Sequence, residues 1–109
     1  MNKIIDTIIG DLDAKKDYRQ NEKRAKALPA EYADAYKNIK KYIFSTSGIL
    51  DMAPLKTLVD MFEEAAASGR KVTDITGPDV AAFADELVRG EKTYLDAIRA
   101  KLNKNVANK

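Results

Sequence analysis

The sequence contains no histidine, no cysteine and no tryptophan. Without histidine and cysteine, the chain lacks the commonest general base, the thiol nucleophile and the usual zinc ligands. The few remaining nucleophiles, such as Ser45, Thr46 and Ser47, have only lysine or carboxylate bases to activate them. We therefore predict that the protein is not an enzyme and that it binds no metal and no cofactor, and we identify no small-molecule substrate.

Glycine and proline are also scarce, with five and three residues respectively, so no long linker or low-complexity tract divides the chain. A length of 109 residues with 45% hydrophobic residues suits one domain, residues 1–109. The apolar start of the chain is interrupted by Asp6, so it fits neither a signal peptide nor a membrane span. We expect a cytoplasmic protein that does not interact with a membrane.

Apolar residues recur at helical spacing between the breaks at residues 28–29, 47–48, 68–69 and 76–78, which predicts an all-α fold. One stripe contains the three tyrosines Tyr32, Tyr36 and Tyr42, which we expect in the core. A second stripe runs from Leu55 to Ala66, and Gly69 follows it as a predicted left-handed C-cap. The acids of this second helix, Asp60, Glu63 and Glu64, are expected on a solvated face.

The last helix has the clearest predicted start. Thr76 is expected to be its N-cap, with Asp79 at the third helical position and a hydrophobic contact between Ile75 and Val80. The apolar residues from Val80 to Leu102 predict one helix of about twenty residues or more, bent near Gly90. Residues 103–109 are predicted to be a frayed basic tail.

The first helix carries two apolar stripes that cannot face one partner. Ile5, Ile8, Ile9 and Leu12 form the first, and Tyr18, Ala25 and Leu28 lie about 140° away from it on an ideal helix. Either the helix breaks between residues 10 and 14, or its first turns pack on something else. Residues 1–12 are thus either a separately packed helix that folds back on the domain or an association segment, whose candidate surface is Ile4, Ile5, Ile8 and Ile9.

Charge is segregated although the net charge is only +2. Between residues 15 and 26, bases outnumber acids by four, whereas residues 49–70 contain four acids and two bases. Such a basic cluster can contact phosphates or an acidic protein surface. The candidate contact residues are Lys15, Lys16, Arg19, Lys23, Arg24 and Lys26.

Residues 28–32, 36–42 and 47–50, and above all the run TGPDVAAFADELVR at 76–89, resemble the family catalogued as domain of unknown function 1048 (DUF1048). The resemblance covers almost the whole chain. It implies a compact all-α domain of about four to five helices in a left-handed superhelical arrangement, as found in small bacterial proteins. It also implies genes that often neighbour transcriptional regulators of the PadR type.

Together, these features favour a non-enzymatic helical protein that binds another protein, either a second copy of itself or a regulator of the PadR type. The alternative is an accessory protein that binds nucleic acid through its basic patches.

Overall fold

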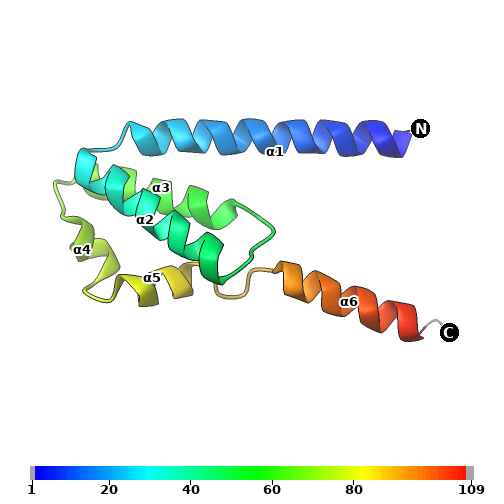
Figure 1. The fold of residues 1–109 in the computed structure, drawn as a ribbon. Helices are drawn as coiled ribbons and strands as arrows, with labels where there is room; N and C mark the ends of the chain where they lie inside the picture. The colour runs from blue at the N-terminus through cyan, green and yellow to red at the C-terminus, as the bar shows by residue number, and fades with distance from the viewer. Residues whose placement is uncertain (1, 108–109) are drawn as a thin grey trace.

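The computed structural model of the chain describes the backbone of residues 2–107 and the side chains of residues 13–107. It contains six helices and no strand within these limits (Figure 1). The all-α prediction is confirmed, with six helices in place of the expected four to five. The helices are α1 (Asn2–Lys26), α2 (Ala30–Thr46), α3 (Ala53–Ala67), α4 (Val72–Thr76), α5 (Val80–Leu87) and α6 (Tyr94–Ala107).

The core lies between α2 and α3 and is closed by the second half of α1, by α4 and by α5. Both predicted stripes are buried: α2 contributes Tyr32, Tyr36, Ile39 and Ile43, and α3 contributes Leu55, Leu58, Val59, Phe62 and Ala65. The rings of Tyr32 and Phe62 meet edge to face, with centroids 5.2 Å apart. Tyr42, at the margin, is partly buried and donates a hydrogen bond from its hydroxyl to Asp85 at 2.9 Å. The core position predicted for the tyrosines is therefore confirmed, with Tyr42 at its edge.

Helix α3 ends as its sequence predicts. Gly69 has a φ of 70°, a left-handed conformation that costs glycine little. Its N–H donates to the carbonyl of Ala66, and the N–H of Arg70 donates to that of Ala65, which satisfies carbonyls of the last turn.

The long last helix predicted from the sequence is wrong, because the chain forms two separate helices there, α5 and α6. Thr76 ends the short helix α4, and Asp79, not Thr76, is the N-cap of α5, where its Oδ1 accepts a hydrogen bond from the N–H of Ala82 at 3.0 Å. Helix α5 then stops at Leu87, and Gly90, with a φ of 82°, turns the chain before α6. Gly90 therefore lies in a turn between two helices, where the sequence predicted a bend within one helix.

Helix α6 extends to Ala107, so residues 103–107 are helical and do not form the predicted frayed tail. Helix α1 is continuous through residues 10–14, which rules out the predicted break there. In its second half, Ala25 is buried and Tyr18 packs against the core. Of the two alternatives predicted for this helix, one remains: the first turns of α1 pack on a different surface from its second half.

The molecule is elongated, with extents of 58 × 31 × 18 Å. Its radius of gyration is 17.1 Å, whereas a compact domain of this length has about 13 Å. Figure 1 shows the reason: the first half of α1 and the whole of α6 project from the same end of the helical body. Two helices thus leave the body without covering one another.

Candidate functional site

Helix α6 differs from the core helices α2 and α3 because every one of its residues is exposed. It carries five of the eight large hydrophobic side chains that are exposed in the part of the chain described at side-chain level. Four of these are spaced by three and four residues and share one face, which we call the α6 stripe. The α6 stripe is Leu95, Ile98, Leu102 and Val106, with exposed fractions from 45% to 64%.

The start of α6 is firmly held although the rest of the helix projects. The Thr93 N–H donates to Asp96 Oδ2 at 3.0 Å, and the Asp96 N–H donates to Thr93 Oγ1 at 3.2 Å, which forms a capping box. An antiparallel bridge joins Ile49 to Thr93, and the N–H of Tyr94 donates to the carbonyl of Gly48 at 2.9 Å. The base of α6 is therefore attached to the loop between α2 and α3.

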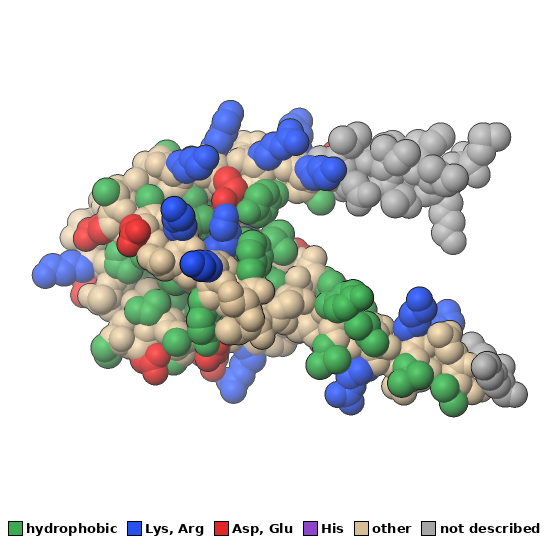
Figure 2. Space-filling model, in the orientation of Figure 1, with side chains coloured by type: hydrophobic (Ala, Val, Ile, Leu, Met, Phe, Trp, Pro, Cys, Tyr) green, Lys and Arg blue, Asp and Glu red, His purple; other side chains and the backbone are tan. Residues whose placement is uncertain are grey.

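Local interactions alone give such a helix little stability. Isolated helices shorter than about 12–15 residues are marginal in water, and most helices in proteins are stabilised by packing of an apolar face. Helix α6 has 14 residues and buries none of them. Basic residues accompany the α6 stripe in Figure 2, and α6 as a whole carries Arg99, Lys101 and Lys104 against Asp96, a net charge of +2. It is an amphipathic cationic helix with a free apolar face.

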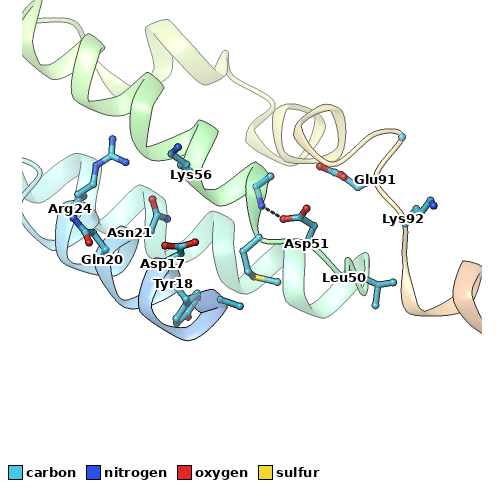
Figure 3. Close-up of a pocket in the computed structure, with 14 residues that line it drawn as sticks. Asp17, Tyr18, Gln20, Asn21, Arg24, Leu50, Asp51, Lys56, Glu91 and Lys92 are labelled. Atoms are coloured by element: carbon cyan, nitrogen blue, oxygen red, sulfur yellow. Dashed lines mark hydrogen bonds between the residues drawn. The ribbon is translucent and has the colours of Figure 1, made fainter. Parts of the chain in front are cut away.

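A groove of about 1060 Å³ lies between α1 and the start of α3, beside the segment that leads into α6. Figure 3 shows labelled side chains of α1 on one side of it and Leu50, Asp51 and Lys56 on the other. Its apolar lining includes Tyr18, Leu50 and Met52, and Asp17 lines it from α1. The volume is close to the upper end of the range of about 300–1,000 Å³ that is typical of small-molecule sites, and it also accommodates the side chains of a protein segment.

The wall of the groove is braced by a polar network between α1 and α2. Tyr36 donates to Glu22 Oε2 at 2.5 Å, Lys40 forms an ion pair with the same carboxylate, and Lys40 also donates to the Tyr18 hydroxyl at 3.0 Å. The amide Nδ2 of Asn21, a buried residue, donates to the Tyr36 hydroxyl at 3.2 Å. Burial alone raises the pKa of Glu22, but the hydrogen bonds from Lys40 and Tyr36 outweigh it and lower that pKa overall.

Five of the six residues predicted to contact phosphates or an acidic partner are exposed on α1: Lys15, Lys16, Arg19, Lys23 and Lys26. At about 100° per residue, they lie within one arc of about 100°, which we call the basic face of α1. None of the five forms an ion pair within residues 13–107. The structure thus brings these five together on one surface.

Arg24, the sixth predicted contact residue, is the exception, because it already pairs with acids of the chain itself. It lies on the opposite side of α1 from the basic face, where it pairs with Asp60 at 2.5 Å and with Glu63 at 2.6 Å. Hydrogen bonds to Glu63 and then Asp60 raise the pKa of the guanidinium further above its usual range. The solvated acidic face predicted for α3 is confirmed, because all three of its acids are exposed, although only Glu64 lacks an ion pair among the described residues.

The side chains of the other predicted interface, Ile4, Ile5, Ile8 and Ile9, lie outside those that the structure describes. The surface that sequence reasoning missed is the α6 stripe, since those residues were assigned to the core-facing side of one long helix. Gly90 was the available signal, because a glycine between two apolar segments can separate two helices as well as bend one. Within the described residues, no cluster of His, Cys, Asp or Glu side chains could hold a metal ion, and no helix is long and apolar enough to cross a membrane.

These observations define a small all-helical protein with one unpartnered amphipathic helix beside a groove. The family model of DUF1048, a protein of unknown function, matches residues 9–107, and the chain belongs to that family. A crystal structure of a DUF1048 protein from Bacillus cereus ATCC 10987, described as a left-handed superhelix fold, is also similar. It has 47% sequence identity and a TM-score of 0.57, and the match covers 60% of this chain and 84% of that chain. No curated protein matches the chain.

The resemblance seen in the sequence is thereby confirmed, and the left-handed superhelix that it implies is the fold described for the solved relative.

Proposed function

We propose that this protein is a non-enzymatic interaction module that docks another protein through helix α6. The observation that carries this proposal is the α6 stripe, whose four aliphatic side chains are exposed along one face of a helix that buries nothing. A contiguous apolar surface of this kind marks an interaction site when it is rimmed by polar groups. A helix laid against an apolar groove is a recurrent mode of protein recognition.

Capture from the native cell tests the proposal. A tagged copy should recover a protein in stoichiometric amount, either the untagged copy of this chain or a different protein, such as a regulator of the PadR type. Leu102→Glu should reduce that recovery about tenfold or more, because it places a carboxylate in the centre of the α6 stripe. Mass spectrometry identifies the recovered protein, and circular dichroism checks that the variant is folded.

Ala100→Glu is the matched control, because it adds the same charge to the opposite face of α6. We expect it to leave recovery unchanged. Recovery that Leu102→Glu does not reduce, or no stoichiometric recovery at all, contradicts docking through α6.

A second candidate function rests on a different observation, the basic face of α1. Five exposed cations within a 12-residue segment of one helix can follow a phosphate backbone, so this face supports binding of nucleic acid. If all five contact phosphates, affinity for a short DNA duplex should fall by about 10²–10³-fold between 50 and 200 mM salt, as measured by fluorescence anisotropy.

Lys15→Gln combined with Arg19→Gln should make the slope of log affinity against log salt shallower by about 1.8, because two phosphate contacts are lost. The control pair Lys37→Gln and Lys41→Gln removes the same charge from exposed positions of α2. Equal effects of the two pairs, or no binding at the lower salt concentration, reject this function.

A further inference from the structure

We propose that the partner of α6 is a second copy of this chain, and that α6 of each copy enters the groove between α1 and α3 of the other. This inference rests on the proposed function and names its partner. The juxtaposition that carries it is the uncovered apolar stripe of α6 and a groove that can receive it, both present in the same chain.

The positions of the two surfaces suit a two-fold dimer. The first half of α1 and α6 project from the same end of the body (Figure 1). The groove lies at their base, where Asp17 of α1 and Lys92, just before α6, line it (Figure 3). A two-fold axis across this end makes α6 of the second copy run toward the first body, in the same direction as α1. The α6 stripe then reaches the groove with Leu102 and Val106 in its leading half. The same contact forms twice, as a closed isologous interface requires.

A chain cannot easily fill its own groove in this way. Lys92 lines the groove, and α6 begins two residues later, where the bridge between Ile49 and Thr93 holds its first turn. From there α6 leads away from the body (Figure 1) for about 21 Å. To bring Leu102 back to the groove, α6 must reverse its direction and give up the contacts that hold its base. A second copy meets the groove without that rearrangement.

Charge also favours this arrangement over other pairings of two copies. Asp13 and Asp17 are exposed, stand four residues apart on one face of α1, and Asp17 lines the groove. On the incoming α6, Lys101 stands at one flank of the α6 stripe, about 100° from its centre, whereas Lys104 lies on the opposite face. With the α6 stripe in the groove, Lys101 therefore comes beside Asp13 and Asp17 of α1. Direct pairing of α6 with α6 brings together two helices of charge +2, which is unfavourable.

The decisive experiment reverses these charges in separate chains. Variant A carries Lys101→Glu, and variant B carries Asp13→Lys and Asp17→Lys. Light scattering after gel filtration should give the wild type about twice the chain mass of 12.1 kDa. Each variant alone should dimerise about tenfold or more weakly, because four attractions across the interface become repulsions. An equimolar mixture of A and B should regain dimerisation close to that of the wild type.

Variant A alone and its mixture with variant B distinguish the proposed dimer from pairing of α6 with α6 and from folding of α6 onto its own chain. If α6 paired with α6, variant A alone would retain the dimer, since Lys101→Glu removes the net charge of +2 from both helices. If α6 folded back onto its own chain, mixing A with B would restore nothing. Either result overturns the proposal, as does a wild type that stays monomeric at about 100 μM, well above the Kd of ordinary specific complexes. If α6 captures only a different protein while the chain stays monomeric, the proposed function stands and this inference fails.

Discussion

Replacing Phe62 by alanine is expected to lower the free energy of unfolding by about 3–5 kcal/mol. Phe62 is completely buried at the centre of α3, and its ring packs edge to face against Tyr32. Its removal deletes apolar surface and leaves a cavity that Leu55 and Leu58, on the same helix, cannot fill without moving. Because domains of this size are stable by about 5–15 kcal/mol, the loss takes a large part of the total.

Urea denaturation followed by circular dichroism at 222 nm measures this change, since the chain has no tryptophan to report by fluorescence. Phe44→Ala is the matched control, because the Phe44 side chain on α2 is 46% exposed. Phe44→Ala should lower the free energy of unfolding by less than about 1 kcal/mol. Similar losses for the two variants contradict the assignment of the core to the contact between α2 and α3.

The second large effect is expected at Glu22, which joins α1 to α2. Glu22→Gln should lower the free energy of unfolding by about 1.5–3 kcal/mol at neutral pH, as is typical of the loss of hydrogen bonds to charged groups. The substitution keeps the size of the side chain but leaves Lys40 without its carboxylate and Tyr36 with a weaker acceptor. Both partners are partly or fully buried, so water compensates for the loss only in part.

The cost of Glu22→Gln should depend on pH in a defined direction. The pKa of Glu22 is lower in the folded chain than its ordinary value, so the carboxylate stabilises the fold at every pH above that ordinary value. The contribution declines as the pH falls from about 4.3 through the folded-state pKa. The difference in unfolding free energy between the wild type and Glu22→Gln should therefore shrink in acid.

Urea titrations at pH 7, 5, 4 and 3 test this dependence. Glu64→Gln is the control, because Glu64 is exposed on α3 and forms no ion pair among the described residues. Its effect should be within about 0.5 kcal/mol throughout. A cost of Glu22→Gln that stays constant from pH 7 to pH 3 contradicts a role for the ionised carboxylate.

The helices α2 and α3 could be predicted in detail, and their stripes are buried as expected. Spacing succeeds there because each helix is long enough to show its period and because its apolar face is the face that the core covers. The same spacing misplaced α6. An apolar stripe looks the same in the sequence whether the surface that covers it belongs to the chain itself or to another molecule.

The sequence also does not reveal which charged side chains are paired in the fold. Arg24 and Lys23 are neighbours in a basic run, and composition does not distinguish them. The fold does, because Arg24 faces the carboxylates of Asp60 and Glu63, 36 and 39 residues away, whereas Lys23 faces solvent. Its pairing depends on how α1 packs against α3, which no local pattern contains.

The sequence by itself determined the all-helical class, the family, the buried stripes of α2 and α3 and the lack of histidine and thiol chemistry. These properties follow from residue types and from spacing within a few turns of helix, so they need no knowledge of distant partners. Only the tertiary structure decided that α5 and α6 are separate, that Arg24 is paired and that the α6 stripe is uncovered. Each of these depends on which surfaces meet across the fold, because burial and charge pairing are settled between segments far apart in the chain.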